Sequence, residues 1–463
     1  MNTQFTDSRK LSLAAAAAVL LATAGNSLAN HAPHAVDGLT NASSTFYLNA
    51  APGELSTPEG NSLYFWGYGT NDAQYVGPTL IVTQGSVVTI YLTNKLPVPA
   101  SILFPGQSNV SVQTERGATI NGLLTREAAP AQLNGTGGGV VRYQFTAHQP
   151  GTYMYHSGTR PDLQIEMGMV GALIVRPVGF NPADAATWKA YAHADSAFDH
   201  EFLLLLSDMD DKIHDAVELQ VQNASSVPAA GLPITVDLNK RMAVYWFING
   251  RCGPDTMLPR FHSSLPVQPY DCFPLFRAGE KVLMRVIGGG SDEHPLHHHG
   301  NHARLIAQDG RLLQSPGGVG ADLSFMEFTV ASTPGGTIDS IFTWTGAGLG
   351  WDPYGHKPGD PLATNEDPAD HGKPFPVILP AEQNLVNGMM YGGSPFLGSP
   401  GALPPGEGGF NPNNGFMYMW HSHAEKEIVN NNIFPGGMLT LALIEAWPYP
   451  PPAPPSPLGS SGA

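Results

Sequence analysis

Short stretches in which apolar and polar residues alternate recur along the first part of the chain. "LIVTQGSVVTIYLTN" (80–94) alternates around Gly85, and "VVRYQFTAHQPGTYMYHSG" (140–158) holds two such stretches with a turn between them. Because successive side chains of a strand point to opposite faces, this pattern predicts strands with one face in a core. The apolar stretch "MVGALIVRP" (169–177) predicts a closing strand. We therefore expect a β-sandwich over residues 40–178.

A second β-rich unit is predicted over residues 200–447. It opens with "HEFLLLLSDMD" (200–210), continues through "EKVLMRVIGGG" (280–290) and closes with "GGMLTLALIEAW" (436–447). The fold class predicted from the whole pattern is all-β, with two Greek-key β-sandwich domains.

Two segments lack this periodicity. Residues from about 347 to 415 are rich in Gly, Pro and Asp and predict a long loop insertion in the second domain. The tail at 448–463 is rich in Pro and Ser and predicts disorder with local polyproline II character.

The N-terminus predicts a secretory signal peptide over residues 1–29. Arg9 and Lys10 precede an apolar, Ala-rich run at 11–24, and Ser27-Leu28-Ala29 offers small residues for cleavage. The run is too short to cross a membrane, and no other stretch predicts a membrane span. We expect a periplasmic or extracellular protein.

The net charge indicates which kinds of partner the protein can bind, and the cysteine content indicates a disulfide. The 463-residue chain carries a formal net charge of −16, which argues against nucleic acid and anionic membrane surfaces and is compatible with metal cations. Its two cysteines, Cys252 and Cys272, are predicted to form one disulfide in an oxidising compartment.

Histidines gather in three places. In "HPLHHHG" (294–300), His297 and His299 share one face of a strand, while His298 points the other way. In "WHSH" (420–423), His421 and His423 share a face in the same manner. His156 ends the strand of "YMYHSG". Imidazole suits copper, zinc and iron, and same-face pairs on strands make half a metal site.

In chain order, "GTYMYHSG" (151–158), "EKVLMRVI…HPLHHHGN" (280–301) and "WHSH…GGM" (420–438) resemble the multicopper oxidases. The resemblance covers about residues 60–176 and 200–447. It implies two cupredoxin-like domains and copper as cofactor. Two-domain members of this family form trimers with copper ligands at the subunit interface, which implies a homo-oligomer and specifically a homotrimer.

The sequence departs from the family at the residues that would bind the blue copper. A blue copper needs a thiolate, two imidazoles and usually a weak axial Met. In the matching positions, His294 supplies one imidazole, Ser422 replaces the cysteine and Glu427 replaces the second imidazole. Met438 is a displaced counterpart of the axial Met. A serine hydroxyl is neutral and a poor ligand for a soft metal, so we expect no blue copper.

The trinuclear cluster that the resemblance implies is also depleted. Leu103 and Pro105 stand where the first histidine pair would be, and Gly158 replaces the partner of His156. The resemblance assigns the remaining histidines to three different coppers. His156 and His423 would bind one copper of the coupled pair, and His299 and His421 the other. The third copper would keep His297 alone. With His294, the candidate metal ligands are His156, His294, His297, His299, His421 and His423. One or two coppers per chain would suit this set.

Three functions stay open. The first is a copper-dependent oxidoreductase that acts on metal ions or a small reductant. The second is a protein that binds copper without catalysis, and the third is a metal-free scaffold. Glu425 and Glu427 are either partners of the site or solvated carboxylates beside Lys426.

Overall fold

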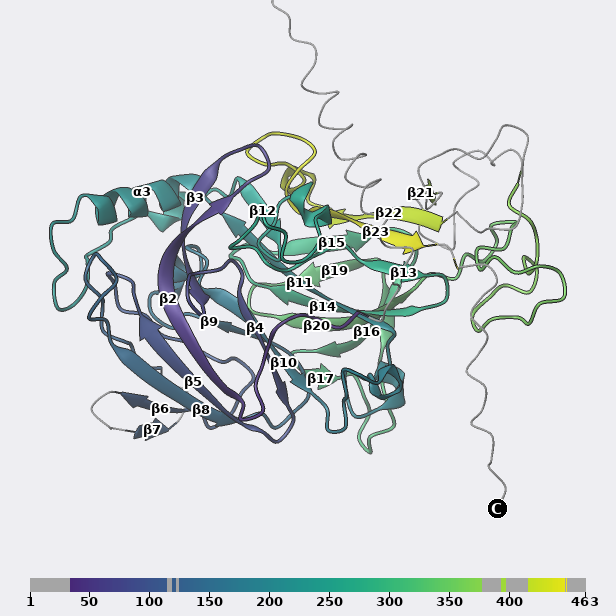
Figure 1. Ribbon diagram of the computed structural model, residues 1–463, viewed down its shortest axis with the longest axis horizontal. Coiled ribbons are helices and arrows are strands. Elements are labelled where there is room, and N and C mark those ends of the chain that lie inside the picture. Colours follow the sequence, from purple (N-terminus) through teal and green to yellow (C-terminus); the bar gives the residue numbers. More distant parts are fainter. Residues whose placement is uncertain are drawn as a thin grey trace, which may run out of the picture.

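The computed structural model describes residues 34–114, 119–121, 125–376, 393–396, 415–445 and 447. They form two β-sandwiches, with the early strands on one side and the later strands on the other (Figure 1). The all-β prediction is therefore confirmed. None of the helices in these residues is long and apolar enough to cross a membrane.

The first sandwich consists of two sheets. One has the order β3 (Ser62–Gly69), β2 (Thr45–Ser56), β5 (Val87–Asn94), β8 (Val140–Thr146), β6 (Ser111–Thr114) and β7 (Thr119–Asn121). The other has the order β1 (Leu39–Thr40), β4 (Gly77–Thr83), β10 (Val170–Arg176) and β9 (Gly151–His156). Alternate residues of β5 and β8 point inward, as the sequence pattern predicts.

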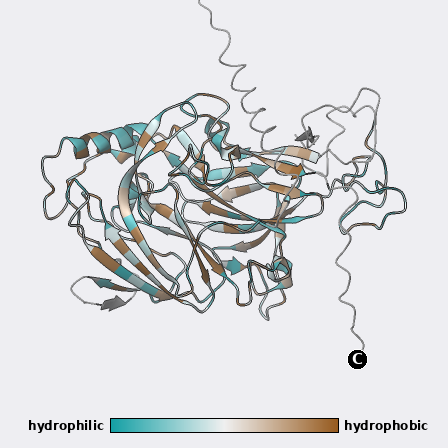
Figure 2. Cartoon of the chain, in the orientation of Figure 1, coloured by the Kyte–Doolittle hydropathy of each residue, from teal (hydrophilic) through white to brown (hydrophobic). Residues whose placement is uncertain are grey.

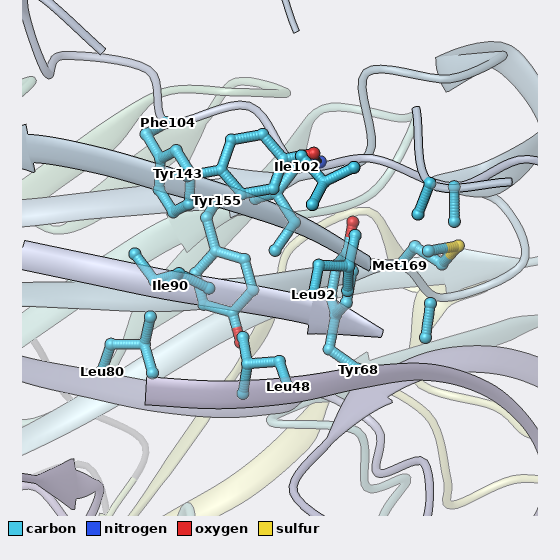
Figure 3. Packing of buried hydrophobic residues seen from close by; sticks show 14 of the residues in the cluster. Leu48, Tyr68, Leu80, Ile90, Leu92, Ile102, Phe104, Tyr143, Tyr155 and Met169 are labelled. Carbon is cyan, nitrogen blue, oxygen red and sulfur yellow. Dashed lines mark hydrogen bonds between the residues drawn. The ribbon is translucent and has the colours of Figure 1, made fainter. Parts of the chain in front are cut away.

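Buried apolar side chains from both sheets meet in one core. Figure 3 shows Leu48 and Ile90 of one sheet packed with Leu80 and Tyr155 of the other. Tyr155 is fully buried and its hydroxyl donates a hydrogen bond to the carbonyl of Pro78 at 2.7 Å. The core thus fixes β9, the strand that ends in His156.

The second sandwich is built in the same way. Its first sheet has the order β12 (Tyr245–Ile248), β11 (His200–Met209), β14 (Lys281–Gly288), β20 (Thr337–Thr343), β16 (Ala303–Gln308) and β17 (Arg311–Leu312), with β18 (Phe325–Glu327) against β16. Its second has the order β13 (Leu275–Arg277), β23 (Leu439–Glu445), β22 (Gly415–Ser422), β15 (His294–His298) and β19 (Thr329–Ser332), with β21 (Gly393–Phe396) against β22.

In the part of the chain that the structure describes, helices are few and short. They are α2 (Pro161–Gln164), α3 (Asp211–Gln222) and the 3-10 turns η1 (Ala185–Thr187), η2 (Ala194–Ser196), η3 (Leu238–Lys240), η4 (Asp255–Met257) and η6 (Glu425–Glu427). Figure 2 shows α3 largely hydrophilic, while hydrophobic residues follow the strands of the sandwiches. The helix α3 packs on β3 through a narrow buried face of Ile213, His214 and Val217.

The two sandwiches are joined by an apolar contact and a buried ion cluster. Met154 and Ala172 of the first sandwich belong to one buried cluster with Leu203 and Phe247 of the second. Beside it, Glu201 on β11 is paired with Arg176 on β10 and with Arg285 on β14, whose Nε donates to Glu201 at 2.6 Å. Burial alone raises the pKa of Glu201, but the two guanidinium groups outweigh it and hold that pKa well below its usual range.

The predicted disulfide is wrong. Cys252 and Cys272 are both free and buried, and they pack in two different apolar clusters. The thiol of Cys272 donates to the carbonyl of Thr256 at 3.3 Å, and burial raises the pKa of both thiols. Each cysteine behaves as a small apolar side chain.

Three predicted segments lie wholly or partly outside the described residues. These are the signal peptide at 1–29, much of the insertion at 347–415 and the tail at 448–463. The described part of the insertion up to residue 376 consists of turns and irregular backbone, and residues 393–396 add a strand to the edge of β22.

Candidate metal centre

The strands β15 and β22 bring two of the predicted histidine pairs together. They are antiparallel neighbours in one sheet, and His297 lies directly opposite His421. Side chains that are directly opposite in an antiparallel pair share one face. His299 follows the end of β15, where its backbone N–H donates to the carbonyl of Met419 at 3.2 Å. The register therefore places these histidines on the same side of the sheet.

The ring nitrogens converge within the range of one metal ion. One ligand nitrogen from each of His297, His299 and His421 lies within 4.8 Å of the other two. The Nε2 atoms of His299 and His421 are 3.4 Å apart. His423 adds a fourth ring, with its centroid 4.7 Å from that of His297. The two motifs thus form a single cluster of four imidazoles.

Hydrogen bonds at the second ring nitrogen fix the orientation of two of these histidine rings. The Nδ1 atom of His421 faces the carbonyl of Ser422 at 2.7 Å, and that of His297 faces the hydroxyl of Thr329 at 2.8 Å. A carbonyl can only accept, so Nδ1 of His421 carries the proton and Nε2 keeps its lone pair. Metal-binding histidines characteristically use their second nitrogen in this way.

Two histidines of the cluster have lowered pKa values, which favour their neutral form. Burial lowers the pKa of His297 to about 4, helped by the neighbouring rings of His299, His423 and His421. Burial also lowers the pKa of His421. Neutral imidazole is the form that binds a metal ion. The donor set therefore fits copper, which takes imidazole ligands readily.

His298 points away from the cluster, as the alternation along β15 predicts. It is buried against Phe342 and Trp420, and its Nε2 accepts a hydrogen bond from the backbone N–H of Ala303 at 3.0 Å. Burial lowers its pKa to about 3. His298 is a core residue of the second sandwich.

His156 lies in the first sandwich, outside the group of three close ligand nitrogens. Its Nδ1 faces the carbonyl of Ser157 at 2.8 Å, the same arrangement as in His421. The backbone of Leu103 pairs with that of His156. A Cβ atom at Gly158 would lie 2.8 Å from the Leu103 side chain, so Leu103 fills the space that a second histidine would need.

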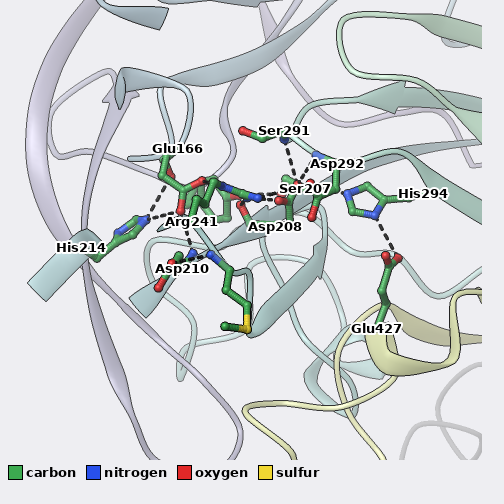
Figure 4. Close-up of polar contacts among 12 residues, drawn as sticks. Glu166, Ser207, Asp208, Asp210, His214, Arg241, Ser291, Asp292, His294 and Glu427 are labelled. Atoms are coloured by element: carbon green, nitrogen blue, oxygen red, sulfur yellow. Dashed lines mark hydrogen bonds and ion pairs between the residues drawn. The ribbon is translucent and has the colours of Figure 1, made fainter. Parts of the chain in front are cut away.

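At the position that a blue copper would take by the family resemblance, the side chains form a closed hydrogen-bond network. Ser422 donates to a carboxylate oxygen of Glu427 at 2.6 Å, and Nδ1 of His294 faces the same oxygen at 2.9 Å. Nε2 of His294 faces Asp208 at 3.1 Å, as Figure 4 shows. All four side chains are buried. With both ring nitrogens against carboxylates, His294 does not join the imidazole cluster.

This network extends into the first sandwich. Asp208 is paired with Arg241, which also contacts Glu166 at 2.5 Å (Figure 4). Sequence alone does not reveal these residues, because an acidic run such as 208–211 is typical of a solvated turn, whereas Asp208 and Asp210 are buried. It also left Glu427 open between two interpretations, and Glu427 proves to be a buried partner of His294.

One exposed apolar side chain, Phe328, borders the cluster. Phe328 is about half exposed, as are Phe325 and Met326 just before it in sequence. The ring of Phe328 packs edge-on against His297 at 5.9 Å. Exposed apolar groups of this kind often mark an interaction surface.

Comparisons with known proteins relate part of the chain to one family. Residues 56–179 match the family model described as multicopper oxidase. Multicopper oxidase VdtB of Byssochlamys spectabilis is 26% identical over 224 residues, which cover 45% of this chain and 30% of VdtB. Iron transport multicopper oxidase FET3 of Saccharomyces cerevisiae is 30% identical over 195 residues, 40% of this chain and 25% of FET3. The matched part of the chain thus spans less than a third of the length of these relatives.

The blue copper oxidase of Nitrosomonas europaea has a solved structure that overlaps 86% of this chain and 85% of its own, with 18% identity and a TM-score of 0.47. The matched residues 56–179 include the motif that ends in His156. This match places residues 56–179 of the chain in the multicopper oxidase family.

Proposed function

We propose that this protein binds copper through His297, His299 and His421, with His423 beside them, and that it has no blue copper centre. The observation that carries the proposal is the convergence of three ligand nitrogens within 4.8 Å on two paired strands. A bound copper ion would supply a centre that changes oxidation state. The protein would hold the ligands neutral and correctly turned through Thr329 and the carbonyl of Ser422.

The absence of a blue copper limits the chemistry. Ser422 offers a hydroxyl that is already bonded to Glu427, so the strand has no thiolate through which electrons could pass between two copper sites. We therefore propose oxidoreductase activity toward a small reductant or a metal ion at the histidine centre itself. A protein that binds copper without catalysis is the alternative outcome.

We further propose that copies of the chain assemble, in particular as a homotrimer, and that His156 of one copy approaches the cluster of another. Two observations support this: Nδ1 of His156 faces a backbone carbonyl as Nδ1 of His421 does, and the half-exposed ring of Phe328 packs against His297. Light scattering on the copper-loaded protein tests it, and a stable monomer would contradict it. Secretion to the periplasm or the exterior is proposed from the N-terminal sequence alone.

The copper proposal is tested with purified wild-type protein and the variants His299→Ala and His421→Ala. We expect the wild type to show an ordinary tetragonal copper signal by electron paramagnetic resonance, without intense blue absorption. Each variant should bind copper at least about tenfold more weakly. His148→Ala removes an exposed histidine of the first sandwich and is the matched control. Equal copper binding by all four proteins would refute the proposal.

A further inference from the structure

A second cluster of metal-binding side chains lies in the irregular segment that follows β20. Asp352, His356, Glu366 and His371 each offer one ligand atom, and these four atoms lie within 4.8 Å of one another. The first three residues are buried and His371 is partly buried. None of the four takes part in the imidazole cluster on β15 and β22. We infer that they form a binding site for a divalent transition-metal ion, with zinc the best match.

The ring nitrogens face the carboxylate of Glu366. Nδ1 of His371 is 2.6 Å from Glu366 Oε1, and Nδ1 of His356 is 3.0 Å from the same oxygen. Nδ1 of His356 is also 3.5 Å from a carboxylate oxygen of Asp352. Around a tetrahedral zinc with bonds of about 2.0–2.2 Å, neighbouring ligand atoms lie roughly 3.3–3.6 Å apart. The four side chains therefore need only small adjustments to share one ion.

The direction of the His371 ring favours a cation. Its Nε2 faces the carbonyl of Asp360 at 2.9 Å and must carry a proton to bond there. In the neutral ring the lone pair is then on Nδ1, pointing at a carboxylate. Two lone pairs face each other without repulsion only if a cation lies between them: either a proton on the ring or a metal ion. The experiment below separates these two cases.

The carboxylates are held in place by the backbone. Asp352 accepts from the N–H groups of Tyr354 and Gly372, both at 2.8 Å, and Glu366 accepts from the N–H of Ala363 at 2.7 Å. Within the described residues, the ion pairs of Asp352 and Glu366 are with histidines and with no Lys or Arg. Unless a ring carries an extra proton, these two buried carboxylates lack a positive partner, and a divalent ion would balance their charge.

An ion at this site would fasten the segment to the second sandwich. Trp351, next to Asp352, is fully buried and stacks on Phe416 of β22 at 6.0 Å. Tyr354 packs in the same core and stacks on His356. The ligands span residues 352–371, so one ion would close a loop of about twenty residues beneath these aromatic rings and reduce its freedom. The site is structural in this interpretation, since all four ligands come from the protein.

The test uses the full chain carrying His299→Ala and His421→Ala, so that zinc cannot be held by the imidazole cluster. In this background we compare His371→Ala, Glu366→Gln and, as control, His148→Ala, after removal of metal with a chelator. Zinc content is measured after dialysis, and thermal unfolding is followed with and without zinc. Glu366→Gln keeps the shape of the side chain, so it reports on the ligand charge even if His371→Ala folds poorly.

The background protein and the His148→Ala control should retain one zinc per chain and unfold at higher temperature when zinc is present. Both ligand variants should bind zinc at least about tenfold more weakly, and zinc should not change their unfolding temperature. Zinc-independent unfolding of the background protein, with no zinc retained, would overturn the inference in favour of an imidazolium–carboxylate pair. Equal zinc binding by the ligand variants and the control would also overturn it. Neither outcome bears on the copper proposal.

Discussion

At the scale of residues, Ser422 stands where the resemblance implies the blue-copper cysteine, and Glu427 stands where it implies a second imidazole. The hydroxyl of Ser422 is fully buried and donates to Glu427, which also faces His294. Hydroxyl, carboxylate and imidazole satisfy one another, and Asp208 closes the network on the far side of His294. A network in which every member has a partner stabilises the fold and leaves little tendency to bind a soft metal.

Restoring the sulfur alone should not restore the blue copper. In Ser422→Cys, Glu427 loses its hydroxyl donor and still occupies the place of an imidazole ligand. We expect a loss of about 1–3 kcal/mol in the free energy of unfolding, because a buried carboxylate loses a hydrogen bond. Urea denaturation and the visible spectrum after copper loading check this. An intense blue colour in the single variant would show that our description of the network is wrong.

A second prediction at this scale concerns Thr329, whose hydroxyl faces Nδ1 of His297 at 2.8 Å. Thr329→Val removes that partner and keeps the shape of the side chain, so the ring can turn. We expect copper affinity to fall by about tenfold. Thr333→Val, at an exposed position shortly after β19, is the control and should leave the affinity unchanged. Titration with copper measures both, and an unaltered affinity in Thr329→Val would count against the role of Thr329.

At the scale of elements, the pairing of β15 with β22 makes the site. His297 opposes His421, and their neighbours His298 and Trp420 oppose each other on the core face. A shift of either strand by one residue would turn its own ligand histidine from the shared face into the core. This register is why two motifs that are more than 120 residues apart in sequence give one cluster.

The helix α3 depends on a cap that is also a tertiary contact. Asp210 accepts from the N–H of Lys212 at 3.0 Å and from that of Met242 at 2.7 Å. Asp210→Ala should lower the free energy of unfolding by about 1–2 kcal/mol, since it removes an N-cap and the partner of the partly buried N–H of Met242.

The neighbouring carboxylate provides a matched control for that change. Burial raises the pKa of Asp211, with Asp210 and Asp215 adding to it, so its charge is not favoured where it lies. Asp211→Ala should therefore have a smaller effect than Asp210→Ala. Chemical denaturation compares the two, and an equal loss in both variants would contradict the proposed cap.

Sequence periodicity predicted the elements and the faces of the histidines, because alternation is a local property of a strand. It could not predict contacts between distant segments. His294 is sandwiched between Asp208 and Glu427, which are 86 and 133 residues away in sequence. Likewise, the proximity of Asp352 and His371 could not be inferred, because an irregular segment has no sequence period.

At the scale of the whole molecule, Glu201 joins the two sandwiches. It is fully buried and paired with Arg176 of the first sandwich and Arg285 of the second. Removing one partner of a buried ion pair leaves an uncompensated charge, so Glu201→Gln should cost about 3–5 kcal/mol of the free energy of unfolding. Thermal unfolding at neutral pH measures this, and a loss below about 1 kcal/mol would show that the pair contributes little.

The same group predicts a dependence on pH. The pKa of Glu201 is lowered in the folded protein, so its stabilisation is present above the usual glutamate pKa of about 4.3 and is lost as the pH falls further. The difference in stability between the wild type and Glu201→Gln should therefore shrink as the pH falls below about 4. A difference that stays constant over this range would contradict the assignment.

The central claim is that three histidines on β15 and β22 hold copper, and the most direct measurement is copper per chain. The purified protein is loaded with copper, dialysed and analysed beside the double variant His299→Ala/His421→Ala. Our account predicts about one copper or more per wild-type chain, because each ligand set of this kind holds one ion, and a clear loss in the double variant. Equal copper content in the two proteins, or none in either, would contradict it.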